Sequence, residues 1–177
     1  MKSISILFAG FGGQGIQFAG KVASYAGLID GREVSLMPLY GPETRGGFST
    51  CAVSVSDELI GSPIVLFPDA LVAMNGQYYD KFIDAVNPGG CAIVDSSIVS
   101  EKTSRGDINA CYVPATAMAT DHDLAGLANM ILIGKLFKET GFCTYEALEQ
   151  AVAKSVPASR QHLLEPNLRA IKLGMEQ

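Results

Sequence analysis

The chain has 177 residues, of which 48% are hydrophobic, so it is long enough to form one domain with a sizeable core. Its formal net charge of −5, without any basic cluster, argues against a nucleic-acid partner. No apolar run approaches the roughly 20 residues that span a bilayer, and the N-terminus lacks a signal peptide. We therefore expect a cytoplasmic protein with no membrane partner.

The first predicted strand, residues 4–9, runs into four glycines within six residues, and a helix is expected over 14–28. Gly10, Gly12 and Gly15 match the spacing of the dinucleotide-binding motif G-x-G-x-x-G. Glycine lets a ligand approach the backbone, and the unpaired N–H groups that open a helix attract anions. The pattern predicts the first strand–turn–helix of a Rossmann-like sheet and a candidate phosphate site. A tight turn without a ligand is the alternative.

The second predicted strand, residues 33–39, ends without the carboxylate that would hold the ribose of a dinucleotide. This absence weakens the case for NAD. A glycine-rich loop follows over 40–49, at the sheet edge where the first glycine turn should also lie. It contains Arg45, whose guanidinium group matches phosphate oxygens. We interpret the loop as a ligand-binding or subunit-contact segment; an exposed arginine paired with Glu43 is the alternative.

The next segment alternates Cys51, Val53 and Val55 with small or polar residues, which predicts a half-exposed antiparallel strand. Buried strands are expected over 70–74, 91–95 and 110–113, with a helix over 75–86. Together these elements predict an α/β fold: one Rossmann-like, three-layer domain over residues 1–177, with a mixed, mostly parallel sheet and a helical C-terminal third.

The C-terminal third opens with a predicted helix over 124–137 that is apolar on nearly every side. A helix of this kind is either central or covered by a partner. We expect another chain to cover this helix or the surface next to it, so that the isolated protein forms dimers or larger species. Two helices follow, the first capped by Thr144 and the last by Ser159.

Few residues are candidates for catalysis. His122 and His162 lack a neighbouring nucleophile and are interpreted as surface residues, and the four scattered cysteines as reduced core residues. The segment Asp95-Ser96-Ser97 ends a predicted parallel strand, where it is either part of a ligand site or a turn. The residues alone indicate a phosphorylated ligand, with no catalytic residue and no metal site.

Four segments together resemble the gamma subunit of 2-oxoacid:ferredoxin oxidoreductases. They are the Gly10-to-Gly15 turn, the loop Tyr40-Gly41-Pro42-Glu43-Thr44-Arg45-Gly46-Gly47, the segment 129–134 and the ending 164–174. The resemblance covers nearly the whole chain, and its combination of motifs is more specific than a glycine fingerprint alone. Size and the lack of a fused ferredoxin segment favour the 2-oxoglutarate type, with pyruvate, branched-chain and indolepyruvate members as alternatives.

The resemblance implies a complex that oxidatively decarboxylates a 2-oxoacid to acyl-CoA and carbon dioxide and reduces ferredoxin. Thiamine diphosphate and iron–sulfur clusters would belong to alpha, beta and possibly small ferredoxin-like delta subunits, and this chain would be inactive alone. It would contact coenzyme A and support assembly. By analogy, the candidate cofactor-binding residues are Gly10, Gly12, Gly13, Gln14, Gly15, Gly41, Glu43, Thr44, Arg45, Gly46 and Gly47. The sequence is also compatible with a stand-alone nucleotide-binding oxidoreductase and with a purely structural subunit.

Overall fold

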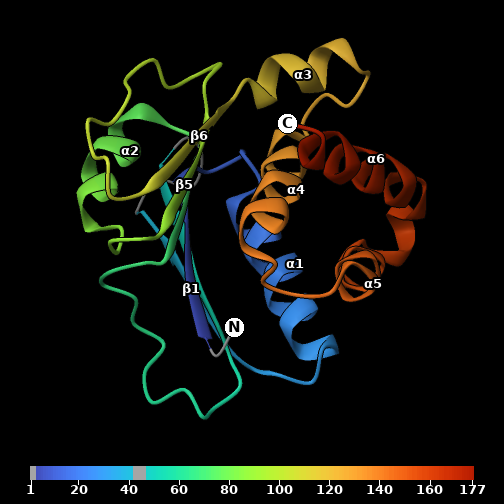
Figure 1. The fold of residues 1–177 in the computed structure, drawn as a ribbon. Helices are drawn as coiled ribbons and strands as arrows, with labels where there is room; N and C mark the ends of the chain where they lie inside the picture. The colour runs from blue at the N-terminus through green and yellow to red at the C-terminus, as the bar shows by residue number, and fades with distance from the viewer. Residues whose placement is uncertain (1–2, 42–46) are drawn as a thin grey trace.

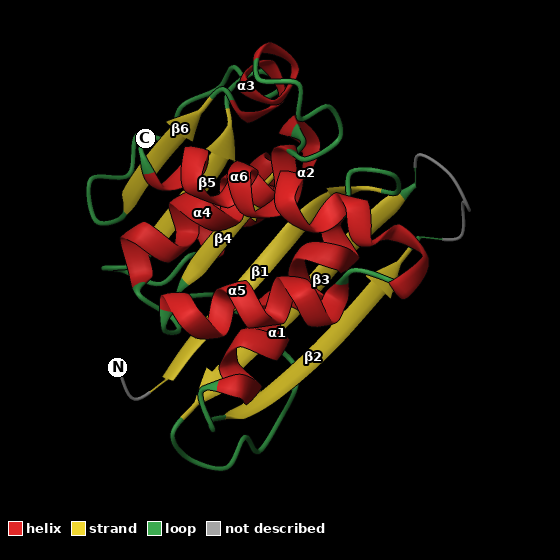
Figure 2. Cartoon of the chain, turned by 90° about the vertical axis from the view of Figure 1, so that its right-hand side faces the viewer, coloured by secondary structure: helices red, strands yellow, loops and turns green. Residues whose placement is uncertain are grey.

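The computed structural model describes residues 3–41 and 47–177, and within them one six-stranded sheet has the order β2-β3-β1-β4-β5-β6 (Figure 2). The strands are β1 Ser3–Phe11, β2 Glu33–Tyr40, β3 Phe48–Ser56, β4 Ala70–Ala73, β5 Cys91–Asp95 and β6 Asn109–Val113. β3 is antiparallel to both of its neighbours, whereas β1, β4, β5 and β6 pair in parallel. The sheet is therefore mixed and mostly parallel, as predicted.

The strand β3 was predicted to be half exposed, and this is wrong. Its two sets of side chains alternate between two cores: Cys51 and Val53 belong to the core on one face of the sheet, and Ala52 to the core on the other. The alternating residues of β3 therefore point to two different buried faces, because helices and loops cover both sides of the sheet.

Helices cover the sheet unequally (Figure 1). They are α1 Ile16–Ile29, α2 Gly76–Phe82, α3 Ala115–Asp121, α4 Ala128–Thr140, α5 Tyr145–Ser155 and α6 Leu164–Met175, with short 3-10 turns η1 Ile83–Ala85 and η2 Ala158–Leu163. α1 and α4 pack on one face, with α5 against α1 and α6 against α4 as an outer layer, whereas α2 covers the other face. The α/β/α layering and the helical C-terminal third are as expected; α3 was not predicted.

The apolar helix α4 is buried by its own chain, so the expectation that another chain covers it is wrong. It begins at Ala128 rather than at residue 124, and Ile131, Leu132 and Ile133 have no exposed surface. The sheet lies on one side of α4 and α6 on the other. An outer layer of helices therefore removes the need for a polar face on α4.

Contact between α4 and α6 depends on two glycines. A Cβ atom added at Gly134 would overlap the backbone of Ile171, and one added at Gly174 would overlap the backbone of Ile131. The two helix backbones can approach this closely only because both positions lack a side chain.

The helix caps were predicted with mixed success. The hydroxyl of Thr144 accepts a hydrogen bond of 3.2 Å from the amide of Ala147 and caps α5, as expected. Ser159 does not cap the last helix, because η2 precedes α6 and Leu163 occupies the N-cap position. Among the described residues, no helix is both long and apolar enough to cross a bilayer.

Candidate functional site at the carboxyl edge of the sheet

The glycine turn joins the end of β1 to the start of α1, as the sequence predicted. Gly13 and Gly15 have φ angles of 101° and 76°, in the left-handed region that favours glycine. A Cβ atom added at Gly13 would meet no atom within 4 Å, so this part of the turn faces open space. The N–H groups that open α1 lie beside it, at the positive end of the helix dipole. The turn therefore has the backbone geometry of an anion site.

The side chain of Gln14 braces this turn instead of pointing out of it. Its Oε1 atom accepts a hydrogen bond of 2.7 Å from the amide of Phe11, and its Nε2 atom donates one of 2.7 Å to the carbonyl of Met74. The amide also covers Gly10, where a Cβ atom would lie 2.5 Å from Oε1. Gln14 thus ties the end of β1 to the end of β4 through both the oxygen and the nitrogen of its amide.

Gly15 is required by a neighbouring side chain. The Nδ2 atom of Asn129 donates a hydrogen bond of 3.1 Å to the carbonyl of Gly15, and a Cβ atom at Gly15 would overlap that amide. Asn129 is only 4% exposed. Sequence reasoning did not assign Asn129 to the glycine turn, although a polar residue inside an apolar helix was a visible signal. The Asn129 contact fixes the N-terminus of α4 against that of α1.

The two glycine segments meet, as the sequence analysis expected. The amide of Gly12 donates a hydrogen bond of 2.9 Å to the carbonyl of Gly47, and the amide of Gly41 donates one of 2.6 Å to Phe48. Tyr40 pairs with Ser49 and Ser49 with Gly10, so β1 and β2 end at one edge. Glu43, Thr44, Arg45 and Gly46 lie outside the described residues.

A cavity of about 290 Å³, here called the edge cavity, opens beside the glycine turn. Its walls include Gly13, Gln14, Met74, Ile98, Thr116 and Thr120. The chain leaves β1 for α1 on one face of the sheet and leaves β4 for α2 on the other, so the cavity lies at a topological switch point (Figure 1). Open α/β sheets bind ligands in this position.

The edge cavity is neutral, because none of the residues that line it carries a charge. Next to Met74, the Oδ1 atom of Asn75 is buried and has no hydrogen-bond partner within the described part of the chain. An unpaired buried acceptor is costly and indicates a missing donor. Asn75 is not among the residues that line the edge cavity, so the cavity itself offers an anion only backbone N–H groups and neutral side chains.

The segment 95–97 was interpreted either as part of a ligand site or as a turn, and Asp95 has the structural role of the turn. Its carboxylate accepts hydrogen bonds from the amide of Ser97 at 3.1 Å and from the hydroxyl of Thr116 at 2.6 Å. It also accepts one of 3.3 Å from the amide of Thr116, in the first turn of α3. Asp95 is fully buried. It therefore links the end of β5 to the start of α3.

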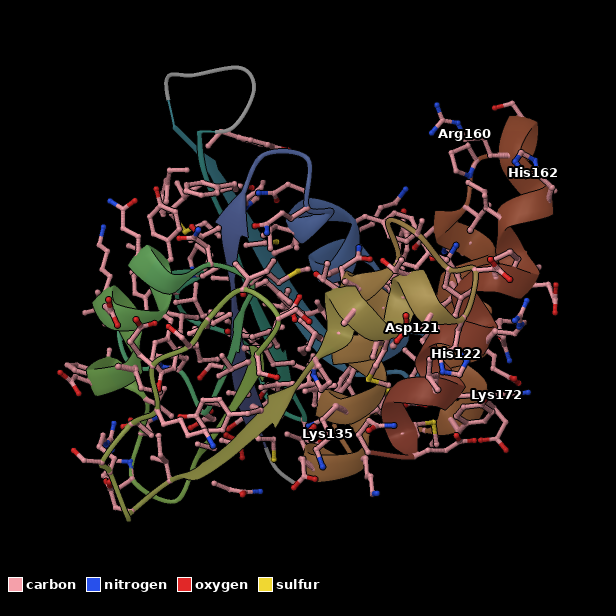
Figure 3. The ribbon with its side chains drawn as sticks, turned by 90° about the horizontal axis from the view of Figure 1, so that it is seen from above. Asp121, His122, Lys135, Arg160, His162 and Lys172 are labelled. Atoms are coloured by element: carbon pink, nitrogen blue, oxygen red, sulfur yellow. The ribbon has the colours of Figure 1, made fainter. Side chains whose placement is uncertain are left out.

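The histidines and cysteines lie largely as predicted. His122 and His162 are exposed, and His122 lies at the end of α3 on the side of Lys172, away from the glycine turn (Figure 3). Cys51 and Cys91 are buried, and burial raises the pKa of each thiol to about 12. Cys111 and Cys143 are partly exposed and pack against the core, and all four thiols are free. No cluster of metal-ligating side chains occurs among the residues described.

Known proteins with similar sequences point to one family. The profile of the pyruvate ferredoxin/flavodoxin oxidoreductase family matches residues 5–177. The 2-oxoglutarate synthase subunit KorC of Methanocaldococcus jannaschii is 38% identical over 97% of this chain and 91% of its own length. The ketoisovalerate oxidoreductase subunit VorA of Methanothermobacter thermautotrophicus is also 38% identical, over 98% of this chain, which spans only 36% of VorA.

Solved structures have the same fold. The gamma subunit of a keto/oxoacid ferredoxin oxidoreductase from Geobacter sulfurreducens is 30% identical and superposes with a TM-score of 0.86 over 99% of this chain and 96% of its own. A 2-oxoglutarate:ferredoxin oxidoreductase from Magnetococcus marinus, solved with 2-oxoglutarate, coenzyme A and succinyl-CoA bound, has a TM-score of 0.88 at 23% identity. The match covers 99% of this chain and 31% of the Magnetococcus chain, and it concerns the fold alone.

Proposed function

Because this chain belongs to the pyruvate ferredoxin/flavodoxin oxidoreductase family, as a gamma-type subunit, we propose that it forms one wall of the coenzyme A site of a 2-oxoacid:ferredoxin oxidoreductase complex. In this proposal residues 1–177 form a single gamma-type domain, and alpha and beta subunits supply thiamine diphosphate, iron–sulfur clusters and the catalytic residues. A small delta subunit and ferredoxin complete the electron path.

The observation that carries the proposal is the hydrogen bond between Gly12 and Gly47, which joins the two glycine segments beside the edge cavity. Gly13 and the N-terminus of α1 present backbone N–H groups to a phosphate of coenzyme A. The cavity itself is neutral, and in this proposal the opposite charge comes from Arg45, which lies in the sequence between Gly41 and Gly47. Coenzyme A, when bound, supplies the thiol that accepts the acyl group.

The proposed oxoacid is 2-oxoglutarate. The KorC relatives from three methanogens are 38–40% identical to this chain, which spans 91–94% of their length. A branched-chain oxoacid is the second candidate, because VorA is as similar over its shared segment. A stand-alone nucleotide-binding oxidoreductase is disfavoured, since the antiparallel β3 lies between β1 and β2, where a parallel second strand would hold a ribose at its end, and β2 also ends without a carboxylate.

Reconstitution tests the proposal. The complex should reduce a viologen dye with 2-oxoglutarate and coenzyme A faster than with pyruvate or 3-methyl-2-oxobutanoate, and this chain alone should show no turnover. A preference for 3-methyl-2-oxobutanoate would show that the oxoacid is branched rather than 2-oxoglutarate, while the proposed role of the subunit would stand. Turnover by the isolated chain with any of these oxoacids would contradict the assignment of catalysis to partner subunits.

A thermal-shift comparison separates the ligand classes. A ligand that binds only the folded chain raises its melting temperature by mass action. Coenzyme A should therefore raise the melting temperature of the complex, or of this chain, more than NAD or NADP at equal concentration. A larger shift with NAD would favour the stand-alone oxidoreductase.

A further inference from the structure

A second cavity, here called the helix cavity, lies among the helices on the α1 side of the sheet. It has a volume of about 390 Å³ and is bounded by α1, the segment before α4, the end of α5, η2 and α6. Its walls include Phe18, Lys21, Leu127, Ser155, Arg160 and Asn167. A cavity of this volume fits a small organic molecule.

Two polar atoms in the wall of the helix cavity have no partner. Ser155 and Asn167 are each 2% exposed, and Ser155 Oγ and Asn167 Oδ1 form no hydrogen bond within the described residues. Asn167 donates from Nδ2 to the carbonyl of Leu163 at 2.7 Å, which fixes the orientation of its amide and leaves Oδ1 as an unused acceptor. A buried acceptor of this kind requires a donor from water or from a ligand.

The charge of this cavity differs from that of the chain. The net charge is −5, yet the side chains that line the cavity include two cations, Lys21 and Arg160, and no carboxylate. Neither cation forms an ion pair within the part of the chain that the structure describes. Figure 3 places Arg160 on η2, at the outer side of the helical layer. The mouth of the cavity is therefore positive.

We propose that the helix cavity binds a small organic anion that carries a hydrogen-bond donor at the end opposite its charge. The phosphate or carboxylate group pairs with Lys21 and Arg160, an apolar body packs between Phe18 and Leu127, and the donor reaches the Oδ1 atom of Asn167. The helix cavity shares Gly15 and Asn129 with the glycine turn, but the proposed contacts use other residues and do not depend on coenzyme A binding at the carboxyl edge.

The probe 4-aminophenyl phosphate has this layout, phenyl phosphate lacks the donor, and inorganic phosphate lacks both donor and apolar body. In calorimetric titration of the full chain, 4-aminophenyl phosphate should bind most tightly, phenyl phosphate next and inorganic phosphate least. The affinity should fall about tenfold when the hydrogen-bond donor is absent and about tenfold again when the buried ring is absent. Equal affinities for the three probes, or no binding at millimolar concentration, would overturn the proposal.

Variants locate the binding. Arg160→Ala should lower the affinity for 4-aminophenyl phosphate about tenfold, because a charge-assisted contact is lost. Lys172 is an exposed cation on α6, and Lys172→Ala should leave this affinity unchanged (Figure 3). Asn167→Ala removes the unused acceptor Oδ1 and should abolish the preference for 4-aminophenyl phosphate over phenyl phosphate. Binding that falls equally in the Arg160 and Lys172 variants would show only surface attraction and refute the site.

Discussion

Gln14 offers a direct test of how the glycine turn is built. Replacing it with alanine removes two hydrogen bonds of 2.7 Å, one from the amide of Phe11 and one to the carbonyl of Met74. Each such bond contributes about 1 kcal/mol. Gln14→Ala should therefore lower the free energy of unfolding by about 2 kcal/mol.

Urea unfolding followed by circular dichroism measures this loss. An unchanged slope of the unfolding free energy against urea concentration would show that the unfolding transition is the same. Gln14→Glu should cost at least as much: its carboxylate still accepts from Phe11, but it cannot donate to Met74 and places a negative oxygen against that carbonyl oxygen. Gln161→Ala is the matched control: its side chain forms one hydrogen bond of 3.4 Å, so the change should stay within about 0.5 kcal/mol. Full stability of Gln14→Ala, combined with lost ligand binding, would show that Gln14 contacts the ligand instead.

Three further substitutions test the packing and the electrostatics. Gly174→Ala should lower the free energy of unfolding by about 2 kcal/mol in a urea titration, because α4 and α6 must separate; a neutral change would refute the close contact. Ile133→Glu should unfold the chain rather than only weaken assembly, as thermal melting with analytical ultracentrifugation would reveal, because Ile133 has no exposed surface; a folded variant would contradict this burial. The hydrogen bond from Lys135, 2.6 Å away, lowers the pKa of Glu139. The ion pair therefore contributes to stability above the pKa of Glu139 in the unfolded state, and this contribution is lost as the pH falls through the pKa in the folded state. Glu139→Gln should therefore cost more stability at pH 7 than at pH 3, and an equal cost at both would refute the ion pair.

The strands and the glycine turn could be predicted because their signals are local. Apolar runs over 70–74 and 91–95 have the length and composition of buried strands, and glycines at 10–15 mark a strand-to-helix turn. The order of strands in the sheet is not local. β3 enters between β2 and β1, so an alternating pattern that resembles a half-exposed strand is buried on both faces.

The environment of α4 and the partners of the turn could not be read from the sequence for the same reason. An apolar helix is compatible with a partner chain or with an outer layer of its own, and only the position of α6 decides between them. The hydrogen bonds of Gln14 to Met74 and of Asn129 to Gly15 join residues 60 and 114 positions apart. Spacing patterns do not report contacts at such separations.

The apparent affinity of the reconstituted complex for coenzyme A, measured with an Arg45→Ala subunit, tests the central claim most directly. The claim predicts a loss of about 1.5–3 kcal/mol in coenzyme A binding, partial rescue by Arg45→Lys, and unchanged thiamine diphosphate binding. Lys138→Ala, an exposed cation whose Nζ atom donates to the carbonyl of Gln177, is the control and should leave the affinity unchanged. An intact complex whose coenzyme A dependence is unaltered by Arg45→Ala would contradict the claim that this subunit's glycine loops form part of the coenzyme A site.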